Sequence, residues 1–330
     1  MPRLFSQLVL CLGAFLSLVP TVVAQETGGA SSPLPSPRLI RLIVPFSAGA
    51  SNDAIARALA APLAKRLDTS VVVENRPGAA GVIGADVVAK SPRDASVLLL
   101  TSSTFLTAAA TQPRLPYDPI AAFAPVGIVG QNPSVLAVSS STPFRTPAEL
   151  FAAARAKPGE ITYGSAGVGS VGHMATELLS AAAKVQMVHV PYKGAANAAI
   201  DLAGGQIQVM ISSYATLSAF LKTGKVRLIA VASREPHPAF PDVPPLVVTV
   251  PGFVNEVWVG VFAPAGTPTR LVERLNREIN EISASAELKP LLESDGMMPA
   301  PITPSAFSAR VKHELTQWKQ IAAARKIVAE

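Results

Sequence analysis

The sequence predicts two α/β domains, each built on a mainly parallel sheet. Short apolar runs with strand character alternate with segments whose apolar residues recur at helical spacing. This alternation is typical of strand–helix–strand units. The runs are too numerous for one compact sheet in a chain of 330 residues, so we expect two sheets. The segments near residues 130–140 and 255–262 are expected to cross between the domains.

The N-terminus has the pattern of a secretory signal peptide. Its apolar core, Leu4–Val19, follows a basic residue and precedes small residues at a plausible cleavage site. The apolar run is short and interrupted, which disfavours a membrane anchor. We therefore predict a signal peptide over residues 1–24, a disordered Pro- and Ser-rich leader over residues 25–37, and a periplasmic location.

Strands and helices follow in alternation after the leader. Ser51 begins the first predicted helix, in which Ile55 and Leu59 start an apolar face with four-residue spacing. A later helix begins at Thr146, with Pro147 in its first turn and Glu149 completing a capping box. Further helices are predicted from residues 81, 268 and 304. The predicted strands are 39–45, 71–73, 97–100, 126–129, 135–138, 161–163, 186–190, 209–211 and 227–232.

The domain boundaries follow from the two crossing segments. We predict that domain I comprises residues 38–135 together with 257–330, and that domain II comprises residues 136–256. The two C-terminal helices would then return to domain I. Their apolar stripes are interpreted as core packing.

Composition and charge exclude several classes of protein. The chain has 28 Lys and Arg against 22 Asp and Glu, and the basic residues form no run longer than two. A nucleic-acid-binding surface would gather them. Cys11 is the only cysteine and lies in the predicted signal peptide, so the mature chain has no disulfide and no thiol nucleophile.

No catalytic or metal-binding motif is present. The four histidines are scattered without metal-ligand spacing, and neither G-x-S-x-G nor H-E-x-x-H occurs. His189 lies in a predicted strand and is interpreted as a core residue, and His237, between two prolines, is expected in a surface loop. No metal, no cofactor and no enzymatic activity are predicted.

The segment from Gly167 to Gly172 matches the dinucleotide pattern G-x-G-x-x-G. A nucleotide site also needs an acid about 20 residues further on to hold the ribose hydroxyls. The sequence there is VPYKG, without an acid. We therefore interpret the glycines differently, as a turn that exposes backbone N–H groups at the start of a helix, where an anion can bind.

A second loop has the same arrangement. The first predicted strand leads through Phe46–Asn52 into a helix. Two helix N-termini facing each other across a cleft could hold one carboxylate from both sides. Asp53 would compete with an anion there, so it is interpreted as a structural cap.

Several segments together resemble the periplasmic solute receptors of tripartite tricarboxylate transporters, also called Bug-type receptors. ENRPGAAG and HVPYKG are specific in combination. The matching segments fall in order from about Leu39 to the C-terminus and are IRLIVPFSAGASNDAIAR, VVVENRPGAAGVIGADVVAKS, LPYDPIAAFAPVGIV, ITYGSAGVGSVGHMATELL, VHVPYKGAANAAIDLAGGQIQVM, GKVRLIAVAS and FAPAGTPTRLVERLN.

The resemblance implies a type II periplasmic-binding-protein fold with a ligand cleft between two domains. It implies a small carboxylate ligand and integral-membrane transporter subunits as partners, and we expect a monomer. The implied site comprises the first loop, one strand end, the glycine loop, a tyrosine that shapes the pocket and a serine after IQVMI. These ligand-binding residues are Phe46, Ser47, Ala48, Gly49, Ala50, Ser51, Asn52, Ser102, Ser103, Thr104, Gly167, Val168, Gly169, Ser170, His173, Tyr192 and Ser212.

One departure from the family bears on the ligand. Many members carry an Asp-Asn pair where this chain has Ser212 and Ser213. An ammonium group would need a carboxylate partner, so we expect an organic acid without an amino group. Two alternatives remain open. One is a receptor that signals through a membrane sensor, and the other is an exported enzyme that uses Ser170 and His173.

Overall fold

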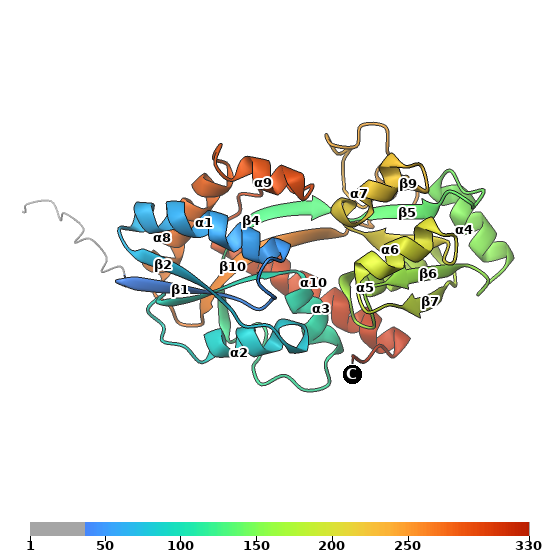
Figure 1. The fold of residues 1–330 in the computed structure, drawn as a ribbon. Helices are drawn as coiled ribbons and strands as arrows, with labels where there is room; N and C mark the ends of the chain where they lie inside the picture. Colours follow the sequence, from blue (N-terminus) through green and yellow to red (C-terminus); the bar gives the residue numbers. More distant parts are fainter. Residues whose placement is uncertain (1–36, 330) are drawn as a thin grey trace, which may run out of the picture. The chain divides into compact units, whose positions relative to one another are not determined.

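The computed structural model describes residues 37–329. The predicted signal peptide and nearly all of the predicted leader lie outside these residues. The strands form two sheets of five strands each, here called sheet A and sheet B. Figure 1 shows that the two sheets are separate. The prediction of two sheets is confirmed.

Sheet A contains the first strands of the chain and one late strand. Strand β3 is buried on both faces, which explains why its sequence is a continuous apolar run rather than an alternating one. The spatial order is β2-β1-β3-β10-β4. The strands are β1 (Leu39–Val44), β2 (Ser70–Asn75), β3 (Val97–Ser102), β4 (Phe123–Pro133) and β10 (Glu256–Pro264).

Sheet B contains the middle of the chain. Its order is β7-β6-β8-β5-β9, and its first four strands by sequence have four or five residues each. The strands are β5 (Val135–Ser139), β6 (Thr162–Ser165), β7 (Val188–Pro191), β8 (Val209–Ser212) and β9 (Val226–Val231).

Helices cover both sheets. The helices that follow strands of sheet A are α1 (Ser51–Leu67), the 3-10 turn η1 (Ala79–Gly81), α2 (Val82–Ala89), α3 (Thr104–Thr111), α8 (Thr269–Ser283), α9 (Lys289–Ser294) and α10 (Pro304–Arg325). The helices within sheet B's part of the chain are α4 (Pro147–Ala156), α5 (Val171–Ala183), α6 (Ala195–Ala203), α7 (Tyr214–Lys222) and the 3-10 turn η2 (Leu246–Val248).

Both sheets are mixed rather than mainly parallel, which corrects the prediction. In sheet A, β10 runs antiparallel to β3 and β4, and in sheet B, β5 runs antiparallel to β8 and β9. The physical reason is the route of the chain. Strands β5 and β10 are each the first strand after the chain crosses from the other sheet. Each runs in the direction opposite to its neighbours in the sheet that it enters.

The core is built from the apolar faces that the helical spacing predicts. Ile55 and Leu59 of α1 pack with strands of sheet A and with α8. A second cluster runs beneath sheet A and continues into sheet B, with Trp258 and Phe307 fully buried in it. Their rings meet edge to face with centroids 5.2 Å apart. Burying a large apolar side chain stabilises the fold by about 1.5–3 kcal/mol.

The segment between β9 and β10 also packs onto sheet B. Its residue Pro245 bridges to Val231 of β9. His237, in the loop that precedes Pro245, is buried. Its Nδ1 accepts a hydrogen bond from the Ala239 N–H at 3.3 Å, and its ring stacks on Phe240. The prediction that His237 lies in a surface loop was wrong, because proline flanks do not show where a loop folds back.

Candidate functional site

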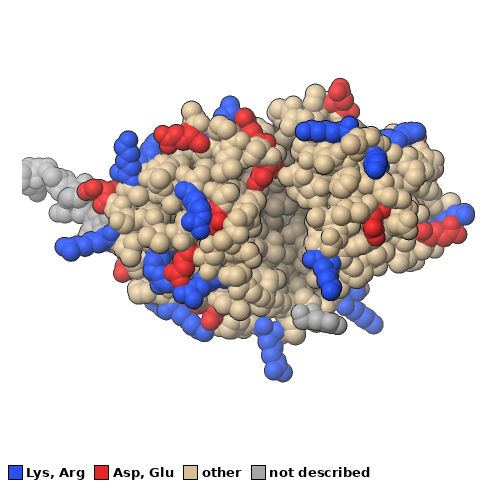
Figure 2. Space-filling view, in the orientation of Figure 1, with Lys and Arg blue, Asp and Glu red and all other residues tan. Residues whose placement is uncertain are grey.

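Four helices begin beside one continuous hollow. Helices α1, α3, α5 and α7 each follow a strand, β1, β3, β6 and β8 respectively. The carboxyl ends of parallel strands meet at the same edge of a sheet, and ligands of open α/β sheets bind there. Figure 2 shows a groove between the two halves of the described molecule, with walls that carry few charged side chains.

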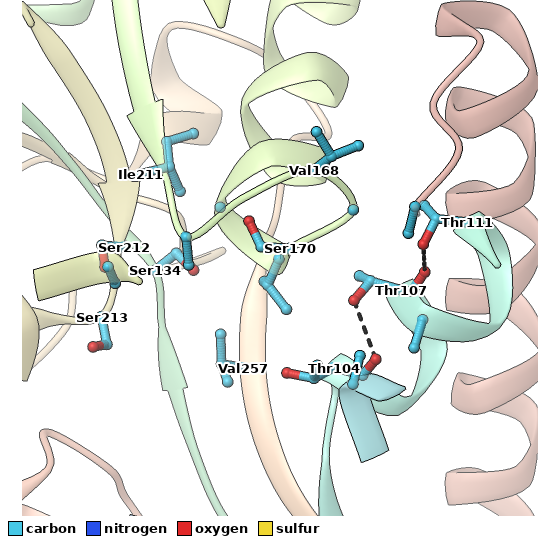
Figure 3. Close-up of a pocket in the computed structure, with 18 of the residues that line it drawn as sticks. Thr104, Thr107, Thr111, Ser134, Val168, Ser170, Ile211, Ser212, Ser213 and Val257 are labelled. Carbon is cyan, nitrogen blue, oxygen red and sulfur yellow. Dashed lines mark hydrogen bonds between the residues drawn. The ribbon is translucent and has the colours of Figure 1, made fainter. Parts of the chain in front are cut away.

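The larger cavity in this hollow has a volume of about 420 Å³. Figure 3 shows α3 on one side of it, and the loop before α5 with the β8–α7 junction on the other. None of its lining side chains is charged. The lining residues are Ala80, Thr104, Thr107, Ala108, Thr111, Gln112, Ser134, Ala166, Val168, Gly169, Ser170, Val171, Gly172, Ala195, Met210, Ile211, Ser212, Ser213, Thr216, Val257 and Ala329.

A smaller cavity of about 310 Å³ adjoins the first. The two share Ser213, Thr216 and Val257 as lining residues. The second cavity contains the one charged side chain among the described residues that line either of them, Asp295, which accepts a hydrogen bond from the Ser51 hydroxyl. Its lining residues are Ser51, Asn52, Ser102, Asn132, Ser213, Ala215, Thr216, Val257, Val259, Asp295 and Met297.

The start of α5 presents unpaired backbone donors to the larger cavity. The Ser170 hydroxyl caps the helix by accepting the His173 N–H at 3.4 Å. Val171 and Gly172 occupy the first two helical positions, and their N–H groups have no acceptor within residues 37–329. Unpaired N–H groups at the positive end of a helix dipole attract an anion without any charged side chain.

The start of α7 repeats this arrangement. The Ser213 hydroxyl accepts the Thr216 N–H at 3.4 Å and also bonds the Thr216 hydroxyl at 2.9 Å. Both residues line both cavities. The cavity therefore has two capped helix N-termini from sheet B's half of the molecule.

The face of α3 supplies hydroxyl groups from the opposite side. Thr104, Thr107 and Thr111 line the cavity together (Figure 3). The Thr107 hydroxyl donates to the Thr104 carbonyl at 3.2 Å, and the Thr111 hydroxyl donates to the Thr107 carbonyl at 2.8 Å. Each oxygen retains lone pairs, so these hydroxyls can also accept a hydrogen bond from a ligand or a water.

The first loop is held by Asp53 rather than left open. The Asp53 carboxylate accepts the Gly49 N–H at 2.8 Å, the Arg57 Nε–H at 3.0 Å and the Asn75 side-chain N–H at 3.0 Å. The Arg57 bond, with the Gly49 and Asn75 bonds, lowers the pKa of Asp53 to about 2. Asp53 thus has a structural role, although it bonds the loop before α1 instead of the helix N-cap.

The structure brings together eight of the residues predicted for the site. Thr104, Val168, Gly169, Ser170 and Ser212 line the larger cavity, and Ser51, Asn52 and Ser102 line the smaller one. The other nine line neither cavity. They are Phe46, Ser47, Ala48, Gly49, Ala50, Ser103, Gly167, His173 and Tyr192.

Two of those nine residues contact the elements that carry the lining residues. The Tyr192 hydroxyl donates to Asp201 at 2.7 Å, and burial together with that carboxylate raises the pKa of Tyr192 to about 12. The tyrosine also packs against Gly164 at the end of β6. His173 lies in the first turn of α5, where its Nδ1 accepts the Gly169 N–H at 3.1 Å.

Sequence reasoning missed the hydroxyls further along α3 and the residues that line the cavity from distant segments. The spacing of Thr104, Thr107 and Thr111 places them along one helix face, and this signal was available. Ala329 and Asp295 gave no local signal, because each reaches the site from the C-terminal part of the chain.

Clusters of metal ligands and membrane-spanning helices are both absent from the described residues. Among residues 37–329, no group of His, Cys, Asp and Glu is arranged to hold a metal ion. None of the helices in the same range has the length and apolar character that a membrane span requires.

Comparison with known proteins assigns the family. Residues 55–327 match the family described as tripartite tricarboxylate transporter family receptor. The chain belongs to this family. A relative described as the UPF0065 protein in the tcbD-tcbE intergenic region of Pseudomonas sp. (strain P51) is 38% identical over 286 residues, which cover 86% of this chain and 85% of the relative.

Solved structures of such receptors have the same fold. The structure described as R. palustris Rpa4515 with adipate is 32% identical, with a TM-score of 0.73, and the match covers 88% of this chain and 98% of that one. The periplasmic binding protein BugD is 30% identical, with a TM-score of 0.70, and the match covers 89% of this chain and 99% of that one. The predicted type II fold is confirmed, and this receptor is a solute-binding protein rather than an enzyme.

Proposed function

We propose that this receptor captures a small organic acid in the larger cavity, with a carboxylate of the ligand at the N-termini of α5 and α7. The observation that carries the proposal is a cavity with two capped helix starts, threonine hydroxyls and no charged lining side chain. Fixed backbone dipoles hold an anion without burying a second charge, which would have its own desolvation cost. The adipate named with a relative at 32% identity is an acid of this class.

The same cavity favours an acid without an amino group. Ser212 and Ser213 are neutral, and among the described lining residues only Asp295 has a carboxylate. That carboxylate already accepts the Ser51 hydroxyl beside the start of α1. An ammonium group in the larger cavity would thus be desolvated without a carboxylate partner.

The cellular role rests on family membership. A receptor of a tripartite tricarboxylate transporter delivers its solute to integral-membrane subunits, and we take these as the partners. The predicted signal peptide and the name of the periplasmic relative BugD both favour the periplasm. The predicted domains, residues 38–135 with 257–330 and residues 136–256, remain our proposal, and it is supported by the division of the strands between two sheets.

The test is a thermal-shift titration of refolded protein with matched ligands. Glutarate and glutamate differ only in the ammonium group, and adipate and 1,6-hexanediol share a six-carbon chain but end in carboxylates and in neutral hydroxymethyl groups respectively. A ligand that binds only the folded state raises the melting temperature as its concentration exceeds Kd. We expect a shift with adipate or glutarate and none with the other two. A shift with hexanediol would overturn the anion site, and a shift with glutamate alone would overturn the exclusion of amino acids.

A further inference from the structure

Three aromatic rings are stacked behind the loop that lines the cavity. Tyr163 comes from β6, His173 from α5 and His189 from β7. The two imidazoles are nearly parallel, with centroids 3.8 Å apart and an interplanar angle of 7°. Tyr163 stacks beside them, at 5.0 Å from His189 and 6.3 Å from His173. Neither histidine lines the cavity. Any effect of the two rings on a ligand bound there must therefore pass through other residues.

Both histidines hold the loop. The Gly169 N–H donates to Nδ1 of His173 at 3.1 Å, which requires a neutral imidazole with its proton on Nε2. Nε2 of His189 bonds the Ser165 hydroxyl at 2.7 Å. That hydroxyl in turn donates to the Gly167 carbonyl at 3.0 Å and accepts the Gly167 N–H at 3.1 Å. The loop is therefore fastened at Gly167 and Gly169 to the two rings.

The surroundings of the pair favour its neutral form. Burial lowers the pKa of His173 to about 4, and burial together with the charge of His173 lowers the pKa of His189 to about 4. The charged groups near the stack are Glu177 of α5 and Arg325 of α10, which pair at 3.0 Å. Glu177 also accepts the Tyr163 hydroxyl at 2.6 Å and partly offsets the lowered pKa of His189.

We propose that His173 is a positioning residue: as a neutral imidazole it holds Gly169, and so the ligand-binding loop, in place, and its protonation releases the loop. A protonated imidazole has no lone pair to accept the Gly169 N–H. Burial of the ring also opposes the new charge, because it deprives the imidazolium of solvation. The effect on affinity rests on the proposed function, because it assumes that the ligand binds at this loop.

The direction of the pH dependence follows from linkage. The held state has a His173 pKa of about 4, and an exposed histidine in the released state has a pKa of about 6.5. The held loop is therefore fully favoured above about pH 6.5 and loses its advantage as the pH falls toward about 4. The ratio of held to released loop falls by at most about tenfold per pH unit in this window. At pH 5 it is about 30-fold lower than at neutral pH.

The first test measures adipate affinity by calorimetry from pH 7.5 to pH 5 in the parent and in His173→Asn. The asparagine side-chain oxygen can accept the Gly169 N–H but does not titrate. The ratio of the two affinities also cancels the titration of adipate itself. We expect similar affinities at pH 7.5 and a parent that is weaker than the variant at pH 5 by up to about 30-fold, the limit reached when the released state dominates. Parallel curves would overturn the proposal.

His173→Ala serves as the matched variant without an acceptor. It should bind adipate weakly at every pH and show the shallow pH dependence of the asparagine variant. His173→Leu has the shape of asparagine without an acceptor, so tighter binding by His173→Asn than by His173→Leu at pH 7.5 separates the hydrogen bond from the bulk of the side chain. Equal affinities for the alanine and asparagine variants would contradict a role for the acceptor. Circular dichroism at each pH confirms that the proteins remain folded.

The second test needs no ligand and distinguishes failure of this inference from failure of the proposed function. Amide exchange at Gly169 is measured by NMR at pH 7.5 and pH 5, with rates corrected for intrinsic pH dependence. We expect the protection factor of the parent to fall by about tenfold or more, while that of His173→Asn stays constant. Constant protection in the parent would overturn the inference whether or not adipate binds.

Discussion

At the scale of single residues, Gly169 is a loop position without room for a side chain. Its φ is +77°, and an added Cβ would lie 2.7 Å from Thr111 Oγ1 and 3.4 Å from Ala329 Cβ. Thr111 and Ala329 line the cavity from the C-terminal side of α3 and from the end of the chain. A side chain at Gly169 would therefore push this loop away from Thr111 and Ala329.

Gly169→Ala is predicted to weaken adipate binding by at least about tenfold, because a displacement of roughly 1 Å in a binding site can cost this much. Gly159→Ala is the matched control. Gly159 also has a positive φ, +81°, but has no atom within 4 Å of an added Cβ. It should lose about 1 kcal/mol of stability through strain alone and keep its affinity. Calorimetry and urea unfolding measure both quantities, and equal affinity losses would count against the steric argument.

Asp53 should make the stability of the protein sensitive to acid. Its pKa is lowered to about 2 from an ordinary value of 3.8. Its stabilising effect is therefore complete above about pH 4 and is lost as the pH falls through 2. Asp53→Asn should lower the free energy of unfolding by about 2 kcal/mol at pH 7, and the difference from the parent should shrink below pH 4. Urea unfolding across this range would contradict the prediction if the difference stayed constant.

At the scale of elements, α10 ties the strands of sheet A that lead to and from sheet B. The Arg310 guanidinium donates to Glu314 at 2.6 Å on the same helix and to Gln131 of β4 at 2.7 Å. It also contacts Glu256 of β10 at 3.4 Å. Trp258 of β10 donates to Glu314 at 2.9 Å. The helix therefore orients β4 and β10 through one half-buried polar network.

Arg310→Met is predicted to destabilise the protein by about 1–3 kcal/mol, because it leaves two partly buried carboxylates without their cation. The control is Lys157→Met, which removes a partner of Glu160 from a pair whose side chains are 69% and 62% exposed. That change should cost under about 1 kcal/mol. Chemical denaturation at low and high salt measures both variants. A loss for Arg310→Met no larger than the control's would show that the network contributes little.

At the scale of the whole molecule, the two crossings between the sheets are bonded to each other. Ser134 joins β4 to β5, and Asn255 precedes β10. The Ser134 N–H donates to the Asn255 carbonyl at 2.9 Å, and the Asn255 side chain donates to the Ser134 hydroxyl at 2.8 Å. Closely paired crossings form a compact hinge, about which two halves of a binding protein can close on a ligand.

Saturating adipate is predicted to decrease the radius of gyration in small-angle X-ray scattering, because a ligand held by both halves favours the closed arrangement. 1,6-Hexanediol at the same concentration should leave the scattering curve unchanged. Binding of adipate by calorimetry without any change in scattering would indicate a preformed, rigid cavity and would contradict hinge closure.

Much of the local structure could be predicted from the sequence. The capping box of Thr146 and Glu149 at α4 is present, and the loop from Gly167 to Ser170 does lie between a strand and a helix start. Apolar spacing identified the buried faces of α1 and α10. These features depend on neighbours within a few residues, where backbone conformation and periodicity are decided.

The composition of the site depended on the tertiary structure. Gly169 lies against Ala329, and Ser51 bonds Asp295, across 160 and 244 residues of chain respectively. The stacked His173 and His189 come from different elements. The antiparallel entry of β5 and β10 was likewise set by the path of the chain between sheets. Contacts between distant segments follow from how the elements pack, and no local pattern encodes them. The sequence by itself therefore determined the elements and the chemistry of the loops, and only packing decided which groups line the cavity together.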